Sequence, residues 1–155
     1  MTFRIRGLSA DPFRHLYGLD AEALARAGVR RYLVDKKPGF PDRITMRDAE
    51  IGETALLINH VTHDVDTPYR TAYAIFVREG AEETFDAVGE APPAMRSRLL
   101  SLRGFDESGM LIDADVIDGR EVESLIERLF ANPRVAYIHA HNAKHGCYSG
   151  LIERA

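Results

Sequence analysis

The sequence predicts an α+β protein whose strands form a mixed, mainly antiparallel sheet. Short segments that alternate apolar and polar residues are separated by Gly, Pro and Asp, which is typical of strands joined by turns. One strongly amphipathic helix lies near the C-terminus, between two pairs of such segments. This order predicts a C-terminal strand–strand–helix–strand–strand unit, and short helices are expected near the N-terminus.

In the N-terminal half, capping residues separate the predicted strands from two short helices. Asp11 and Asp20 are suited to cap these helices, and Gly18 and Gly28 are suited to end them. A loop rich in Pro and Gly follows at 36–41. The strands expected up to residue 80 are Phe3–Leu8, Val29–Asp35, Arg43–Met46, Thr54–His60 and Tyr73–Gly80.

The C-terminal helix is the clearest element. Asp118 can act as its N-cap, and Glu121 three residues later completes a capping-box pattern. One face of the helix is apolar, through Val122, Leu125, Ile126, Leu129 and Phe130. The strand Arg98–Phe105 is expected to pair with Met110–Ile117. The helical crossover would make Met110–Ile117 parallel to Val135–His141 if both lie in one sheet.

Length and composition limit the class of protein. The 155 residues fit one globular domain, 1–155. A net charge of -4 argues against broad nucleic-acid binding, which needs a basic face. The single cysteine cannot form an intrachain disulfide, so a reducing compartment is expected. Because no secretory signal or membrane span is apparent, we expect a cytoplasmic protein without a membrane partner.

The segment "YIHAHNAKHGCY" (Tyr137–Tyr148) contains three of the six histidines and the only cysteine. Side chains two apart in a strand share a face, so His139 and His141 should point the same way. A three-residue loop with left-handed Gly146 is favoured, and it would place Cys147 on that face. A four-residue loop, 143–146, would send Cys147 to the opposite face.

Two kinds of chemistry fit this segment. His139, His141 and Cys147 could bind a divalent metal such as zinc, which takes nitrogen and sulfur ligands. Alternatively, Cys147 is a nucleophile activated by a histidine, with His139 as the partner. The competing interpretation is structural: Cys147 packs as a small hydrophobe and the histidines form hydrogen bonds within the sheet.

A second group of polar residues lies between 60 and 78. The segment "HVTHDVDTPYR" places His60, His63, Tyr69 and Arg70 in a predicted loop, and loops on a rigid scaffold often bind ligands. Arg70 and Arg78 could hold a carboxylate or phosphate between two guanidinium groups. These five residues are the predicted ligand-binding set.

The ordered motifs of the chain resemble those of a known family. They are "KKPGFPDR" (36–43), "TPYRTAYAIFVREGA" (67–81), "RLLSLRGFDESGMLIDADVIDG" (98–119) and "VAYIHAHNAKHGCY" (135–148). Together they are similar to the bacterial domain-of-unknown-function family 1203, over nearly the whole chain. The resemblance implies a small bacterial protein with no assigned activity, and therefore no catalytic residues to transfer. Asp42 stands where the family commonly has a cysteine, which puts a two-cysteine mechanism in doubt unless Asp42 serves as an oxygen ligand.

The sequence leaves two functions open. The first is a small-molecule or metal-binding protein, which could be an enzyme, with its site at the C-terminal strands. The second is a non-catalytic interaction domain that forms a homodimer. A concave pocket that contains the histidines and an arginine would favour the first, and a symmetric apolar interface would favour the second.

Overall fold

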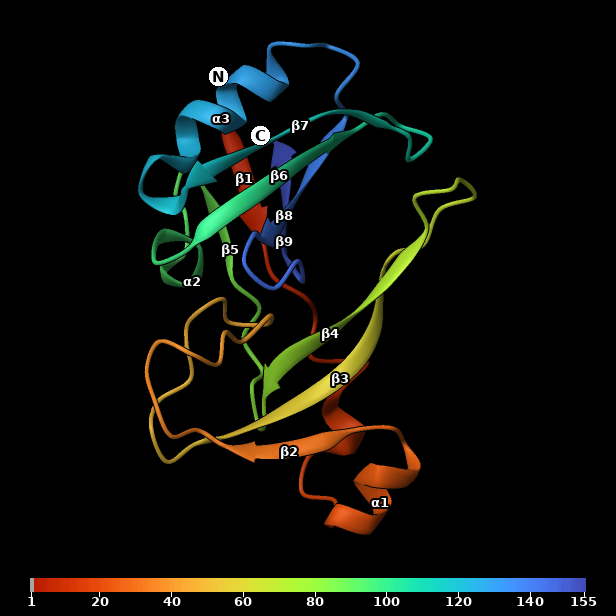
Figure 1. Ribbon diagram of the computed structural model, residues 1–155, viewed down its shortest axis with the longest axis vertical. Helices are drawn as coiled ribbons and strands as arrows, with labels where there is room; N and C mark the ends of the chain where they lie inside the picture. The colour runs from red at the N-terminus through yellow and green to blue at the C-terminus, as the bar shows by residue number, and fades with distance from the viewer. Residues whose placement is uncertain (1) are drawn as a thin grey trace.

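A computed structural model describes residues 2–155 and shows an α+β fold with mainly antiparallel strands (Figure 1). The helices are few and short, and the longest is α3. The elements, in chain order, are β1 (Phe3–Arg6), a 3-10 turn (Arg14–Leu16), α1 (Ala21–Arg26), β2 (Arg30–Leu33), β3 (Thr54–His63), β4 (Thr71–Arg78), β5 (Asp86–Val88), α2 (Pro93–Arg96), β6 (Leu99–Phe105), β7 (Leu111–Asp118), a 3-10 turn (Gly119–Glu121), α3 (Val122–Phe130), β8 (Tyr137–Asn142) and β9 (Tyr148–Arg154).

The strands form two sheets where the sequence had suggested one. The larger sheet has the order β5-β1-β9-β8-β6-β7, and the smaller has the order β2-β3-β4. Every pairing between neighbouring strands in both sheets is antiparallel. The crossover through α3 does make β7 and β8 parallel in direction, but β6 lies between them and pairs with both. The predicted ββαββ unit is therefore confirmed as β6-β7-α3-β8-β9.

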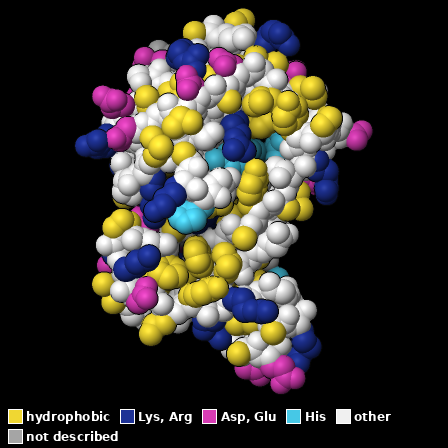
Figure 2. Space-filling model, viewed as in Figure 1, with side chains coloured by type: hydrophobic (Ala, Val, Ile, Leu, Met, Phe, Trp, Pro, Cys, Tyr) yellow, Lys and Arg dark blue, Asp and Glu magenta, His cyan; other side chains and the backbone are white. Residues whose placement is uncertain are grey.

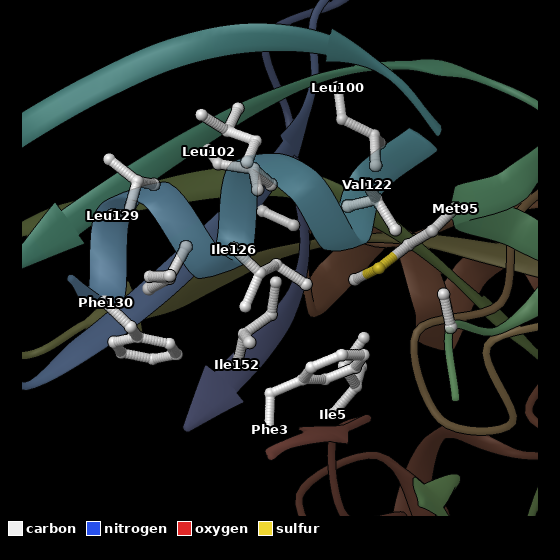
Figure 3. Close-up of a cluster of buried hydrophobic side chains, with 14 of the residues drawn as sticks. Phe3, Ile5, Met95, Leu100, Leu102, Val122, Ile126, Leu129, Phe130 and Ile152 are labelled. Atoms are coloured by element: carbon white, nitrogen blue, oxygen red, sulfur yellow. The ribbon is translucent and has the colours of Figure 1, made fainter. Parts of the chain in front are cut away.

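The helix α3 covers one face of the large sheet. All five residues of its predicted apolar stripe are buried, and they pack with Phe3, Ile5 and Ile152 from the strands (Figure 3). Burying apolar surface of this kind contributes about 25 cal/mol per Å², so the stripe anchors the helix. The predicted capping box does not form. Asp118 instead accepts a hydrogen bond from the backbone N–H of Arg120, which caps the preceding 3-10 turn.

The small sheet packs against the N-terminal segment and shares a core with the large sheet. Leu56, Ile58 and Ile75 lie in one buried cluster with Leu24 of α1 and Tyr148 of β9. The Asp20 carboxylate accepts a hydrogen bond from the Ala23 N–H at 2.8 Å, which confirms it as the cap of α1. The helix expected after Asp11 is only a single 3-10 turn. The large and small sheets meet where the ends of β8 and β9 approach β3 and β4 (Figure 1).

The prediction of a strand at 43–46 is wrong, and the strand β5 was not predicted. Residues 43–45 form a turn, and a bridge pairs Pro41 with Asp48 on either side. The turn lies against the end of β1, so closely that a side chain on Gly7 would place its Cβ 2.3 Å from the Ile44 carbonyl oxygen. Such a contact tolerates only glycine. The chain here joins the two sheets rather than extending either of them.

None of the helices in residues 2–155 has the length and the apolar run that a membrane crossing needs.

Candidate functional site

The length of the loop between β8 and β9 determines whether Cys147 lies on the same face of the hairpin as His139 and His141. The Asn142 N–H donates to the Cys147 carbonyl oxygen at 2.9 Å, so the loop has four residues, 143–146. Gly146 has a φ of +79°, and its left-handed conformation is confirmed. The favoured three-residue loop is wrong. Cys147 therefore lies on the face of the hairpin opposite to His139 and His141, because strand neighbours alternate between faces.

His139 and His141 share one face of the large sheet, as predicted, and both are buried. Their ring centroids are 6.5 Å apart, and the residues are 5% and 2% exposed. Burial lowers the pKa of His139 to about 3, and neighbouring His63, His141 and Arg103 act in the same direction. Burial also lowers the pKa of His141 to about 4, although its bond to the Gly146 carbonyl opposes this shift. Both rings are therefore neutral at pH 7.

His63 reaches these histidines because β3 contains a β-bulge. Val61 pairs with Ala72 and His63 pairs with Thr71, so Thr62 has no partner on β4. The extra residue reverses the alternation of side chains. His63 consequently turns toward the large sheet, where its ring centroid lies 4.8 Å from that of His139.

His63 also forms a directed pair with Tyr137. Its Nδ1 lies 2.9 Å from the Tyr69 carbonyl oxygen, and its Nε2 lies 2.6 Å from the Tyr137 hydroxyl. A carbonyl can only accept, so Nδ1 carries the proton and the tyrosine hydroxyl donates to Nε2. Burial raises the pKa of Tyr137. The His63 ring therefore links the β3–β4 hairpin to β8, and both of its nitrogens take part in hydrogen bonds.

The predicted metal site is not assembled. In the described part of the chain, 2–155, no group of three or more His, Cys, Asp or Glu side chains is placed to hold a metal ion. His139 and His141 lie together, but Cys147 points away from them for the reason given above. His139 is likewise not the partner of Cys147 that the nucleophile prediction requires.

The other predicted ligand-binding residues are distributed along β3, β4 and the connection between these strands. His60 packs edge-on against Phe13 with ring centroids 5.0 Å apart, and burial lowers its pKa. Tyr69 and Arg70 lie at the mouth of a cavity of about 370 Å³ that also contains His63, His139 and His141.

The predicted clamp of Arg70 and Arg78 does not form. Arg78 is the last residue of β4, so the other seven residues of this strand separate the two arginines, roughly 25 Å at about 3.4 Å per residue. Arg70 pairs with Asp64 at 3.1 Å, and Arg78 lies 3.5 Å from a Glu53 oxygen. The β-strand between them, which the sequence did indicate, is what prevents a shared ligand.

Cys147 lies beside an arginine that sequence reasoning did not select. The Arg43 Nη2 is 3.0 Å from the Cys147 sulfur, while its Nε and Nη1 donate to the carbonyls of Tyr148 and Pro41 at 2.9 and 2.7 Å. Arg43 is 2% exposed. Burial lowers its pKa, and the neighbouring Cys147 opposes that shift. The thiol is the only side chain that accepts a hydrogen bond from this guanidinium within residues 2–155.

Asp42 holds the turn that positions Arg43. Its Oδ1 accepts from the N–H groups of Ile44 and Arg78 at 3.3 and 2.9 Å. Its Oδ2 accepts from the backbone N–H of Thr45 at 2.8 Å and from the Thr45 hydroxyl at 2.5 Å. Both oxygens are therefore engaged in the turn, and the structure gives Asp42 a capping role rather than that of an oxygen ligand beside Cys147.

Cys147 and Arg43 open onto a cleft of about 580 Å³ between the two sheets, which we call the Cys147 cleft. Lys36, Arg98, Lys144 and His145 lie around it, and no described residue that lines it is acidic. Arg98 is neutralised by Asp48 at 2.5 Å, but Lys36 and Lys144 form no ion pair within residues 2–155. Figure 2 shows basic and histidine side chains next to hydrophobic ones at the junction of the two parts of the molecule. The remaining lining residues are Pro38, Gly39, Pro41, Leu57, Tyr73, Ala74, Phe76 and Asn142.

A larger hollow of about 940 Å³ on the other side of β8 has a different charge balance. It is lined by Arg4, Arg6 and Arg154 together with His139 and Tyr137. Arg4 pairs with Asp86 at 2.5 Å and Arg6 pairs with Glu153 at 2.6 Å. Arg154 instead donates to the backbone carbonyls of Phe130, Asn132 and Val135. Because carboxylates match two of the three arginines and backbone carbonyls engage the third, the hollow has less capacity for an anion than the Cys147 cleft.

Sequence reasoning missed Arg43, Asn142 and Tyr137 as site residues. Arg43 had been placed in a strand, and an arginine is normally expected at the surface. The lone cysteine gave no indication of which cation would face it. The motif "KKPGFPDR" does contain both Lys36 and Arg43, so its basic character was the one available signal.

Comparisons with known proteins identify a family. A family model described as "Protein of unknown function (DUF1203)" matches residues 39–154. No curated protein matches the chain, and no solved structure matches it either. The family match covers Arg43, Asn142, Cys147 and the whole of the larger sheet except β1. The chain therefore belongs to the DUF1203 family of proteins of unknown function.

Proposed function

We propose that this protein binds a small organic anion in the Cys147 cleft. The observation that supports this proposal is the unmatched positive charge of the cleft, where Lys36 and Lys144 meet no carboxylate among the described residues. A cleft with low-dielectric walls and one sign of charge concentrates ions of the opposite sign. Its volume of about 580 Å³ lies within the usual range for small-molecule sites.

The apolar part of the lining narrows the ligand class. Leu57, Tyr73 and Phe76 come from the small sheet and provide a hydrophobic wall opposite the β8–β9 loop. A ligand that satisfies both walls has a carboxylate or phosphate group and an apolar portion. Benzoate is the simplest probe with these two features, and benzamide is its neutral counterpart of the same shape.

A titration by isothermal calorimetry tests the proposal. We expect benzoate to bind, and benzamide to bind at least about fivefold more weakly. In the double variant Lys36→Ala/Lys144→Ala, the Kd for benzoate should rise by at least about fivefold, since two exposed ion contacts of about 0.5 kcal/mol each correspond to that factor. Equal affinity for benzoate and benzamide would contradict the proposal.

The chain offers a matched control for this variant. Its three lysines are Lys36, Lys37 and Lys144, and only Lys37 does not line the cleft. Lys37 is exposed and pairs with Glu50. The variant Lys37→Ala should therefore bind benzoate like the unmodified protein. If it weakens binding as much as the double variant, the effect belongs to the net charge of the molecule and not to the cleft.

The homodimer remains a separate prediction. Large apolar side chains are exposed on strands of both sheets, with Leu33 at 67%, Val88 at 60% and Val116 at 51%. They lie on β2, β5 and β7, which are edge strands of the two sheets. Light scattering of the purified protein over a range of concentrations gives its mass and so decides between monomer and dimer.

A further inference from the structure

We propose that Cys147 is a nucleophile, and that the Cys147 cleft selects anionic electrophiles for it. This inference rests on the anion-binding function proposed above and assigns a reaction to the same site. It depends on three independent observations, which concern the guanidinium of Arg43, the amide of Asn142, and the access to the sulfur.

The first observation is the environment of the sulfur. Arg43 is fully enclosed, and its remaining donors are fixed by the carbonyls of Pro41 and Tyr148. A buried charge is stable only when it is paired or well hydrogen-bonded. The carboxylate of neighbouring Asp42 is engaged in its own turn, so the side-chain acceptor left for the guanidinium is the Cys147 sulfur at 3.0 Å. The thiolate is the reactive form of cysteine.

The second observation is an unpartnered polar group in the same cleft. Asn142 is 5% exposed and lines the cleft, and its Nδ2 lies 3.7 Å from the Cys147 sulfur. Its Oδ1 is buried and has no hydrogen-bond partner within residues 2–155. Buried amides almost always have partners. A ligand with a hydrogen-bond donor beside its reactive carbon would satisfy this oxygen, which points to a built site rather than to a cysteine used only for packing.

The third observation is access. Cys147 is partly exposed, unlike the structural cysteines that pack in a core. It lies at the end of the β8–β9 loop, with Lys144 and His145 in the preceding turn. The two side chains lie on the exposed rim of the cleft, so an entering anion meets positive charge before it reaches the sulfur.

The reaction is a displacement at carbon. The thiol first loses its proton to water. The thiolate sulfur then forms a bond to an electrophilic carbon of the bound anion, and the bond from that carbon to its leaving group breaks. The leaving group departs with the electron pair, so the step needs no oxidant or reductant. The predicted substrate class is a small organic anion that bears such a carbon and a hydrogen-bond donor.

Alkylation by iodoacetate and iodoacetamide tests this inference in the full chain. Both reagents transfer a two-carbon unit to sulfur and release iodide, but only iodoacetate is an anion. Because the chain has one cysteine, intact-mass spectrometry follows a single adduct. We expect the iodoacetate-to-iodoacetamide rate ratio of the protein to exceed that of glutathione by at least about tenfold, the lower end of electrostatic rate enhancement. A ratio equal to that of glutathione would overturn the selection of anions.

Measurements at high salt and in lysine variants test whether the preference for iodoacetate arises in the Cys147 cleft. The excess ratio should disappear in about 1 M NaCl, where the screening length is about 3 Å. It should fall at least threefold in Lys36→Ala/Lys144→Ala and stay unchanged in Lys37→Ala, and both variants are expected to fold because these side chains are exposed. An equal decrease in Lys37→Ala would overturn the assignment to the cleft.

Two further measurements separate this inference from the proposed function. The rate with neutral iodoacetamide at pH 6.5 should exceed that of glutathione by about tenfold if the Arg43 contact activates the sulfur; a rate no higher than that of glutathione overturns the nucleophile. Benzoate binding to Cys147→Ser, which needs no sulfur, tests the anion site alone. If this variant binds benzoate while the thiol of the unmodified protein shows no enhanced reactivity, the nucleophile is wrong and the binding function stands.

Discussion

His139 and His141 are buried on the face of the large sheet that meets the β3–β4 hairpin, and the cost of charging them is high. The pKa of His139 lies at about 3, against an ordinary value of 6.5, mainly because burial disfavours the imidazolium. Its ring packs among aromatic groups, with Tyr148 at a centroid distance of 5.1 Å and Phe105 at 5.3 Å. Its role is best described as a neutral polar ring within an aromatic cluster.

This environment predicts the pH dependence of stability. Between pH 6.5 and about 3, the unfolded chain binds a proton at His139 that the folded protein excludes, so the free energy of unfolding falls as the pH falls through this window. Above pH 6.5 the contribution is constant. In His139→Leu, urea unfolding should show a shallower loss of stability between pH 6.5 and 4.5 than in the unmodified protein. The control His15→Leu removes an exposed histidine and should leave the slope unchanged; an unchanged slope in His139→Leu would contradict the account.

Arg43 shows what residue type alone does not reveal. Its sequence neighbours suggested a strand, yet Asp42 starts a buried turn there, and the arginine enters the protein. A buried arginine needs acceptors on every side, and here they are the carbonyl of Pro41 two residues earlier, the carbonyl of Tyr148 and the Cys147 sulfur. The last two meet Arg43 only after β9 has folded against the turn, which is why sequence reasoning could not find them.

At the scale of elements, the β-bulge in β3 places His63 in the site. The sequence predicted the strand and the histidine but not the bulge, because Thr62 has none of the glycine signals that often mark such irregularities. Similarly, the shared face of His139 and His141 followed from strand periodicity alone. The position of Cys147 depended on one residue of loop length, which periodicity does not determine.

The hydrogen bond that the bulge allows His63 to form can be tested by substitution. In His63→Leu the Tyr137 hydroxyl loses its partner at the histidine Nε2. Leaving a buried polar partner unpaired costs about 1–3 kcal/mol, so we expect the free energy of unfolding to fall by at least about 1 kcal/mol. The variant Thr62→Val removes only a hydroxyl that has no partner within residues 2–155. It should cost little; a cost as large as that of His63→Leu would argue against the hydrogen bond as the cause.

Other elements show where local signals suffice. The apolar stripe of α3 and the cap at Asp20 were predicted from spacing and are confirmed. The division into two sheets was not predicted, because pairing between distant strands is not encoded in any local pattern. The same limit explains the wrong Arg70 and Arg78 clamp, since the two side chains were grouped by residue type before the strand between them was considered.

At the scale of the whole molecule, the Cys147 cleft exists because two sheets meet. The small sheet supplies the apolar wall, the 36–43 segment supplies Lys36 and Arg43, and the β8–β9 loop supplies Cys147 and Lys144. The molecule carries a net charge of -4, so the positive cleft is a local feature that opposes the overall charge. Local positive potential on an acidic protein favours small anions over polyanions such as nucleic acid, for which an extended basic face is required.

Amide chemical-shift mapping with benzoate tests the binding site most directly. A titration followed in proton–nitrogen correlation spectra reports on every backbone N–H of the folded protein at once. We predict that saturable shift changes concentrate in residues 36–43 and 142–147, and that Lys36→Ala/Lys144→Ala needs at least about fivefold more benzoate to reach half of them. Saturable changes centred instead on Tyr137 and His139, or no saturable change at all, would contradict the assignment of an organic anion to the Cys147 cleft.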